Sequence, residues 1–278
     1  MVGRGLIELK NKYVGKKVAF LGSGSSLLDF DLGKLDDDIM CFSFNRFIPF
    51  CFDFWENLRL DFFMAHDYTV LQSSFYNQFM NRKNLSRDEK YEIDNDIVKK
   101  YKDTITSDFA LSDERMKDTK IIISDDIHNP HATRFGLLQN SEWIEKNEEL
   151  LGARSFYTYK IKKKTPNDVF LNISHVNSED INIDTWAKNS FCNSALPLML
   201  YMGFSEIYLF GVDYSDKGYF FCESKGAEGY KPRETSDFNR LMTFAETLPH
   251  KPKIYSVKTD KVNIVAKDGF IDFSEIST

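Results

Sequence analysis

Short apolar runs that end in small or polar residues recur along the chain. Residues 16–21 (KKVAFL) lie between charged residues and a glycine, a pattern that indicates a short buried strand. Runs with the same strand character occupy residues 39–42, 61–65, 121–124, 206–210 and 253–257. Residues 154–161 are expected to form an edge strand or one arm of a hairpin.

Helical patterns separate several of these strands. Residues 193–202 predict a buried helix that ends at Gly203, because glycine is a favoured residue just after a helix. Residues 237–248 predict a helix with one apolar face. Residues 87–102 and 143–151 also have helical character. Strands that alternate with helices predict a Rossmann-like, doubly wound α/β fold with a mainly parallel sheet.

The length of 278 residues suits a single α/β domain over residues 1–278. Polar segments around residues 68–118, 160–186 and 215–235 interrupt the regular pattern and are expected to form a small lid region.

Composition narrows the class of protein further. The net charge is −6 and no basic stripe occurs, which disfavours a nucleic-acid partner. No apolar window approaches the roughly 20 residues needed to span a bilayer. We therefore expect a cytoplasmic protein with at most peripheral membrane association. The four cysteines, Cys41, Cys51, Cys192 and Cys222, have no metal-binding spacing and are expected to be buried thiols.

The loop Gly22-Ser23-Gly24-Ser25-Ser26 follows the first predicted strand directly. Glycines let a backbone approach a phosphate closely, and serine hydroxyls with exposed N–H groups bind its oxygens. Leu27 stands where a GxGxxG motif has its third glycine, and no Walker lysine follows. The loop is therefore either a phosphate site or a tight strand-to-helix turn.

Polar residues also end the next two predicted strands. Asn45 follows the second strand, where an amide can bond a ribose, a base or a phosphate, or can simply close a turn. His66 and Asp67 follow the third strand and offer a titratable group and a carboxylate that could hold Mg²⁺. A structural role for His66 is the alternative. Ligands of open parallel sheets bind at the carboxyl ends of strands, so one pocket is expected here.

Several stretches together resemble a known family. VAFLGSGSSLLDFD, CFSFNRF and MGFSEIYLFGVDY are similar to motifs of the bacterial sialyltransferases of glycosyltransferase family 42. The related group of MptE-like pyrophosphokinases and flagellin-modifying glycosyltransferases shares much of this pattern. The resemblance covers the first 70 residues or so and residues 189–262. It implies a GT-A-like nucleotide-binding domain.

The resemblance also implies a donor-nucleotide site. The loop serines and Gly24 would contact the nucleotide phosphate or ribose. Asn45 matches the family's nucleotide-binding Asn, and Asp213 matches the Asp that ends the family's GxD strand. The predicted nucleotide-binding residues are Gly22, Ser23, Gly24, Ser25, Ser26, Asn45, His66, Asp67, Ser190, Asn193, Asp213 and Ser215.

The predicted catalytic residues depart from the family's pattern. The family's catalytic His would fall near Pro232 or Arg233, so Glu234 or His66 is the expected general base. Ser215 and Phe221 align with the two tyrosines that stabilise the leaving phosphate in the family. Tyr214 and Tyr219 lie next to these positions and are predicted to replace them.

The leading hypothesis is an inverting glycosyltransferase. It would move a sugar, first of all a nonulosonic or sialic acid, from a CMP- or other nucleotide-linked donor to a glycan or lipid-linked oligosaccharide. No cofactor is required, and family members often form homo-oligomers. One alternative is an ATP-dependent pyrophosphokinase with Mg²⁺ on Asp67 and Asp213. Another is an inactive nucleotide-sugar-binding protein.

Overall fold

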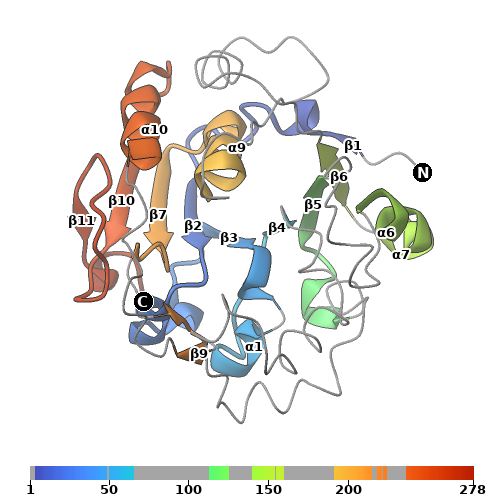
Figure 1. The fold of residues 1–278 in the computed structure, drawn as a ribbon, viewed down its shortest axis with the longest axis horizontal. Coiled ribbons are helices and arrows are strands. Elements are labelled where there is room, and N and C mark those ends of the chain that lie inside the picture. The colour runs from blue at the N-terminus through green and yellow to red at the C-terminus, as the bar shows by residue number, and fades with distance from the viewer. Residues whose placement is uncertain are drawn as a thin grey trace, which may run out of the picture.

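The computed structural model describes residues 4–48, 50–65, 113–124, 140–153, 155–159, 191–214, 218–220, 222–223 and 236–278. Their frame is a nine-stranded sheet with the order β1-β6-β5-β4-β3-β2-β7-β10-β11, in which all neighbours pair in parallel (Figure 1). The strands are β1 (Arg4–Gly5), β2 (Lys17–Leu21), β3 (Ile39–Phe44), β4 (Phe62–Ala65), β5 (Lys120–Ser124), β6 (Phe156–Tyr159), β7 (Glu206–Phe210), β10 (Lys253–Val257) and β11 (Phe270–Ile271).

The order of the strands reverses once near the middle of the sheet. From β2 the chain adds β3, β4, β5 and β6 on one side, and it then returns to place β7 on the other side of β2. β10 and β11 continue outward from β7. The reversal between β2 and β7 is a topological switch point, the place where open α/β sheets bind ligands.

Both faces of the sheet are buried, because alternate residues of each strand enter different cores. Val18 and Phe20 of β2 belong to one apolar cluster, and Ala19 and Leu21 belong to the other. The central strands are therefore apolar at nearly every position, which is why their runs were visible in the sequence.

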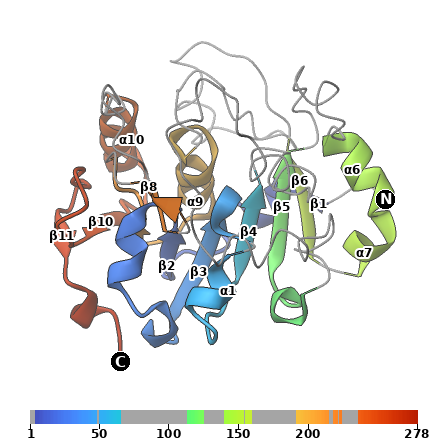
Figure 2. The same ribbon diagram turned by 60° about the horizontal axis from the view of Figure 1, so that its bottom comes forward.

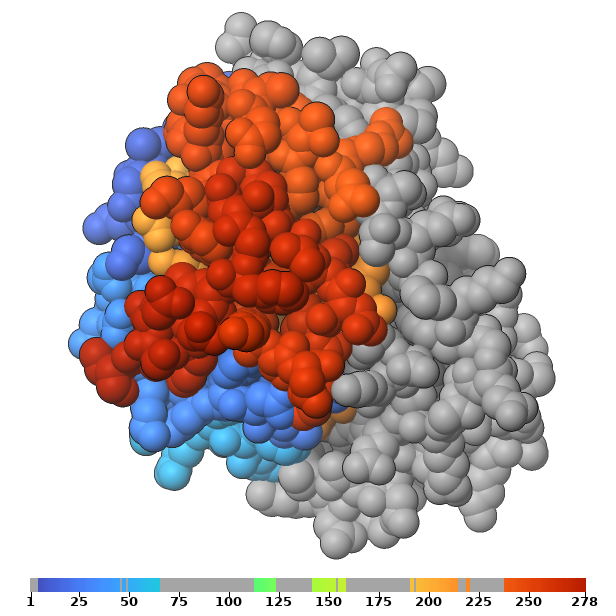
Figure 3. Space-filling model, turned by 90° about the vertical axis from the view of Figure 1, so that its left-hand side faces the viewer, coloured from blue at the N-terminus to red at the C-terminus, as the bar shows by residue number. Residues whose placement is uncertain are grey.

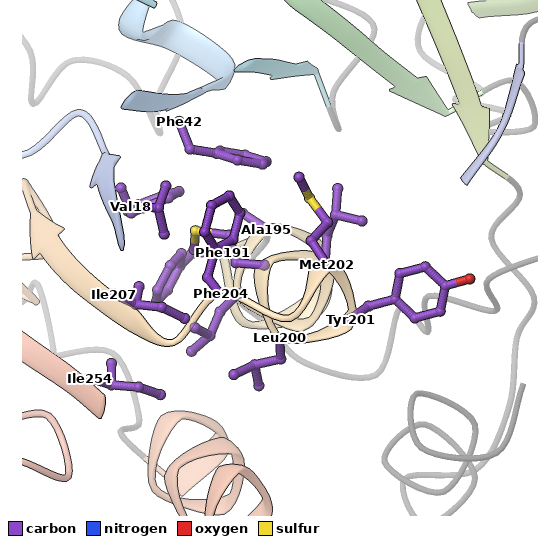
Figure 4. Close-up of a cluster of buried hydrophobic side chains, with 14 of the residues drawn as sticks. Val18, Phe42, Phe191, Ala195, Leu200, Tyr201, Met202, Phe204, Ile207 and Ile254 are labelled. Carbon is purple, nitrogen blue, oxygen red and sulfur yellow. The ribbon is translucent and has the colours of Figure 1, made fainter. Parts of the chain in front are cut away.

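The described helices lie on both faces of the sheet (Figure 1). The helices α9 (Leu196–Met202) and α10 (Ser236–Thr247) cover one face. Around α9, side chains such as Phe191, Phe204 and Ile207 pack closely (Figure 4). The other face carries the short helices α1 (Cys51–Phe54), α6 (Asn140–Lys146) and α7 (Glu148–Gly152).

Short helical turns complete the described chain. Most are 3-10 helices: η1 (Leu6–Leu9), η2 (Ser25–Asp29), η3 (Leu32–Lys34), η4 (Asn45–Phe47), η6 (Glu114–Met116) and η8 (Phe273–Glu275). The segment η7 (Phe191–Ala195) is a π-helical turn that leads into α9. A second, two-stranded antiparallel sheet pairs β8 (Gly218–Tyr219) with β9 (Cys222–Glu223).

The structure confirms the predicted α/β fold with a parallel, doubly wound sheet. The prediction for residues 154–161 was wrong in part, since β6 pairs in parallel with both β5 and β1 and is neither an edge strand nor a hairpin arm. The helix expected at 193–202 begins as the π turn η7 and ends at Gly203, whose φ of 85° is left-handed as a C-cap requires. The helix expected at 87–102 lies outside the described residues, and so does most of the expected lid.

The described cysteine side chains agree with the sequence interpretation. Cys41, Cys51 and Cys192 are buried and form no disulfide. Burial raises the pKa of the Cys41 thiol to about 12, so this thiol stays protonated at neutral pH. Within the described parts of the chain, no helix has the length and apolar character needed to cross a membrane.

Candidate functional site

Three loops leave the same edge of the sheet at the switch point. β2 ends at Leu21, which pairs with Ser43 of β3 on one side and with Phe210 of β7 on the other. The segments Gly22–Ser26, Asn45–Phe47 and Gly211–Tyr214 follow these ends. The structure thus brings the loop, Asn45 and Asp213 to one edge of the sheet. The loop and Asn45 were predicted to share a pocket with His66 and Asp67, and Asp213 was implied by the family resemblance.

The loop after β2 is interlocked with the loop after β7. Gly22 donates its N–H to Phe210 O at 2.9 Å, and Gly24 donates to Gly211 O at 3.0 Å. A Cβ on Gly22 would lie 2.5 Å from Gly211 O, so only glycine allows this approach. The two glycines of the motif therefore serve first to dock one loop against the other.

Asp213 holds the same loop through its side chain. The carboxylate accepts the Ser26 N–H at 2.9 Å on Oδ2 and the Ser26 hydroxyl on Oδ1. A Cβ on Gly24 would lie 2.5 Å from Cγ of Asp213, which explains the second glycine. Asp213 is 5% exposed, and burial raises the pKa of its carboxyl group while the two hydrogen bonds from Ser26 oppose that shift.

One hydroxyl of the loop lacks a protein partner in the described structure. Ser25 is 9% exposed, and its Oγ makes no hydrogen bond there. A buried polar atom without a partner costs free energy, which a ligand oxygen at this place would recover. Ser25 is thus the loop side chain best suited to bind a ligand, whereas the hydroxyl of Ser26 is engaged by Asp213.

The segment around β8 lies beside the loop that follows β2 (Figure 2). Tyr219 forms an isolated antiparallel bridge with Gly24, and Phe220 donates its N–H to Ser23 O at 3.0 Å. The Phe220 ring is buried against Phe47 and Trp55, with ring centroids 5.5 and 5.4 Å away. The predicted catalytic residue Tyr219 therefore lies next to the predicted phosphate loop.

Two other predicted residues have left-handed backbones at the strand ends. Asn45 has φ 47°, which asparagine tolerates better than most residues. Tyr214 has φ 49°, a conformation that costs free energy and often occurs at functional sites. The Tyr214 hydroxyl lies 3.3 Å from Cys192 Sγ, and its ring packs edge-on against Phe238. Tyr214 thus points toward the α9 face, whereas Tyr219 lies at the loop.

Other predicted site residues cannot be placed in this arrangement. His66, Asp67, Ser190, Ser215 and Glu234 lie outside the described residues. The main chain of Asn193 belongs to the π turn η7. In the described parts of the chain, no group of three or more His, Cys, Asp or Glu residues has a metal-binding arrangement.

The sequence interpretation missed the segment that follows β10. Asn263 donates its N–H to the carbonyl oxygen of Asp213 at 2.9 Å. In the same segment, Thr259 and Lys261 bind the carboxylate of Asp29 at the end of η2. No spacing or motif in the sequence connects these residues, because they meet only through the sheet.

The fold and the interlocked loops define a parallel α/β protein whose candidate ligand site lies at its switch point. No protein-family model matches the chain, and no curated protein matches it significantly. Solved structures of bacterial sialyltransferases do match. The sialyltransferase CstII from Campylobacter jejuni, in complex with the substrate analogue CMP-3FNeuAc, is 16% identical, with 91% of this chain and 88% of that chain covered and a TM-score of 0.37.

Two further structures are similar to the same degree. CstII from Campylobacter jejuni in complex with cytidine-5'-monophosphate is 15% identical, covers 92% of this chain and 87% of its own, and has a TM-score of 0.39. The monofunctional α-2,3-sialyltransferase Cst-I from Campylobacter jejuni is 13% identical, with coverages of 94% and 85% and a TM-score of 0.40. At such low identities and TM-scores, the function of this chain has to be argued from its own residues.

Proposed function

We propose that this protein is a glycosyltransferase of the sialyltransferase type that binds a nucleotide-activated sugar at the switch point between β2 and β7. The observation that carries the proposal is the interlocked pair of loops at this point, with Ser26 bound to Asp213 and Ser25 Oγ left for a ligand. Ligand sites at switch points are a general property of open α/β sheets. A loop that follows a strand and contains glycine and serine is well suited to bind the phosphate of a nucleotide.

The loop would bind the phosphate of the donor. Ser23 and Ser25 supply hydroxyls, and Gly24 permits close approach of the backbone. Asn45 stands at the neighbouring strand end, where its amide can bond the ribose or base. Asp213 would act mainly through Ser26, because both of its carboxylate oxygens are engaged there. A CMP-linked nonulosonic acid is the first donor to test.

The proposed reaction is a direct displacement with inversion. The acceptor hydroxyl oxygen forms a bond to the anomeric carbon of the donor sugar while the bond from that carbon to the phosphate oxygen breaks. The electron pair of the broken bond leaves with the nucleotide phosphate, which Tyr219 and loop amides stabilise. The acceptor proton passes to a general base, for which Glu234 and His66 are the two proposed residues.

The hydrogen bonds of Asp213 favour this reaction over the pyrophosphokinase alternative. That alternative predicts strict dependence on Mg²⁺, with Asp67 and Asp213 as candidate ligands. A metal ion on Asp213 would have to reach a 5% exposed carboxylate whose two oxygens each already accept a hydrogen bond from Ser26. We therefore expect nucleotide binding that does not depend on Mg²⁺.

A thermal-unfolding panel tests the choice of ligand. The protein is mixed with CMP, CMP-sialic acid, UDP, UDP-sugars, GDP or ATP, each with Mg²⁺ or with EDTA. A ligand at about 100 times its dissociation constant stabilises the native state by about 2.7 kcal/mol. We expect this stabilisation with CMP and CMP-sialic acid, equally with and without metal. Stabilisation by ATP and Mg²⁺ alone would favour the pyrophosphokinase.

A matched pair of serine variants locates the binding site. Ser25→Ala removes the hydroxyl without a described partner, and it should weaken binding of CMP by about three- to tenfold. Ser205→Ala is the control, since Ser205 accepts a hydrogen bond from Gly15 N at the opposite edge of the sheet. Equal affinities for the two variants would place the nucleotide elsewhere.

A transfer assay then tests the activity itself. CMP-sialic acid is incubated with a panel of glycan acceptors, and free CMP and the extended glycan are measured together. Equal amounts of both products are expected for a transferase. CMP binding without either product would instead support the inactive nucleotide-sugar-binding protein.

A further inference from the structure

A polar cluster connects the end of η2, which continues from the Gly22–Ser26 loop, to the C-terminal part of the chain. Asp29 is the last residue of η2, the turn that begins at Ser25. Its Oδ1 accepts from Lys261 Nζ, and its Oδ2 accepts from Thr259 Oγ1 at 2.6 Å. Thr259 Oγ1 also accepts the Lys261 N–H at 3.3 Å, which holds the two partners of Asp29 together.

This cluster joins segments that are far apart in the chain. The segment after β10 contacts both the end of η2, through Asp29, and the loop after β7, through the Asn263–Asp213 hydrogen bond. In a space-filling view, the C-terminal residues lie directly against the N-terminal ones (Figure 3). The segment from Gly22 to Asp29, which comprises the loop and η2, therefore contacts the loop after β7 at its start and the segment after β10 at its end.

The cluster is also partly shielded from solvent. The side chains of Lys261 and Asp29 are 26% and 31% exposed, against 37% and 61% for the Lys17–Asp38 pair at the opposite edge of the sheet. Lys261 is close enough to Asp213 to lower the pKa of its carboxyl group, against the larger effect of burial. A shielded ion pair with an additional hydroxyl donor holds its geometry better than an exposed pair.

We infer that Asp29, Thr259 and Lys261 are positioning residues that keep the Gly22–Ser26 loop in its ligand-binding shape. They act through the loop and need not touch the ligand. The inference rests on the proposed function for the identity of the ligand, but the shape of the loop can be measured without any ligand. Loss of the cluster should loosen η2 and so weaken phosphate binding, because ordering the loop would then oppose binding.

Hydrogen exchange of the free protein tests the effect on the loop. Leu27 donates to Gly24 O and Phe30 donates to Leu27 O, so both amides report on η2. We expect Lys261→Gln to increase exchange at these amides about twofold to fivefold, as expected for the loss of a partly exposed ion pair. Lys17→Gln is the matched control and should leave them unchanged. Unchanged exchange in Lys261→Gln would overturn the inference.

A charge exchange separates positioning from a general loss of stability. Asp29→Lys and Lys261→Asp should each loosen η2, and the double variant should restore protection, because the opposite charges face each other again. Lys261→Arg should retain most of the protection. No recovery in either the double variant or Lys261→Arg would overturn the inference.

The dissociation constant of CMP and the steady-state constants distinguish a positioning role from a purely structural one, which would leave them unchanged. In Lys261→Gln, the dissociation constant of CMP should rise about threefold to fivefold, and KM for the donor should rise with kcat unchanged. A normal dissociation constant for CMP despite a loosened loop would contradict the positioning role. If the parent protein binds no CMP, the proposed function fails, whereas the exchange measurements still decide whether the cluster shapes the loop.

Discussion

The two sides of the candidate site are built from different chemistry. On the β7 and β10 side, polar contacts hold the loop through Asp213, Ser26 and the cluster around Asp29. On the β3 side, the contacts are aromatic, with Phe220 packed against both Phe47 and Trp55. Directional hydrogen bonds define where the loop lies, whereas the rings exclude water and tolerate small shifts.

The difference predicts how substitutions on each side lower the stability of the protein. Removing a ring leaves a cavity, which costs stability at every pH. Substitutions on the polar side change the geometry of the loop, and their effect on the free energy of unfolding depends on the protonation of Asp213.

The largest expected loss of stability is on the aromatic side. Phe220→Ala should lower the free energy of unfolding by about 3 kcal/mol, because removal of the 2% exposed ring leaves a cavity beside Phe47 and Trp55. The free energy is measured by urea denaturation. Phe270→Ala is the control, since Phe270 is 43% exposed and should lose less than about 1 kcal/mol. Equal losses of unfolding free energy in the two variants would contradict the close packing of Phe220 against Phe47 and Trp55.

Gly24→Ala tests the contact between the two sides of the switch point. The new Cβ would meet the Asp213 carboxylate, so we expect a loss of about 2 kcal/mol and CMP affinity weaker by at least about tenfold. Both are measured by denaturation and calorimetric titration. Gly33→Ala is the control, because its nearest neighbour would lie 3.4 Å away. A stable Gly24→Ala variant with normal affinity would mean that the loops can separate freely.

Tyr219→Phe tests the predicted catalytic residue that, in the described part of the chain, lies beside the loop through its main-chain bridge with Gly24. Without the hydroxyl, kcat should fall about tenfold through weaker stabilisation of the leaving phosphate. KM and the unfolding free energy should change little. Tyr255→Phe on β10 serves as the control. A higher KM with unchanged kcat would assign Tyr219 to ground-state binding instead.

The smallest effect, and the one most specific to the polar side, is pH dependence. Burial raises the folded-state pKa of Asp213 above its value of about 3.9 in the unfolded chain. Protonated Asp213 therefore contributes stability that is complete below about pH 4 and is lost as pH rises through the raised pKa. Asp213→Asn should remove this change.

The comparison is made by denaturation of the parent and Asp213→Asn from pH 4 upward. At low pH, the parent and Asp213→Asn should have similar free energies of unfolding, because a neutral carboxyl group and an amide have the same shape and each can bond Ser26 through one acceptor and one donor. As pH rises, the parent should lose stability relative to Asp213→Asn, because burial disfavours the ionised carboxylate. A parent that gains stability over Asp213→Asn as pH rises would show that ionised Asp213 is the stabilising form.

Much of the fold could be predicted from local sequence. β2, β3 and β7 are apolar on both faces, so their runs stand out from the polar segments around them. β1 and β11 escaped prediction because two residues are too few to show any pattern. The parallel arrangement then implied that the strand ends share one edge, which predicted that Gly22–Ser26 and Asn45 lie together. Asp213 was implied by the family resemblance.

The sequence by itself determined which strands form and which polar residues follow them. Only the tertiary structure decided what these residues contact. Ser26 and Asp213 are 187 positions apart, and Asp29 and Lys261 are 232 apart. Such pairings depend on the order of strands in the sheet, and no local pattern of residues encodes that order. The sheet brings β2, β7 and β10 side by side, and for that reason a loop near the N-terminus is held by residues near the C-terminus.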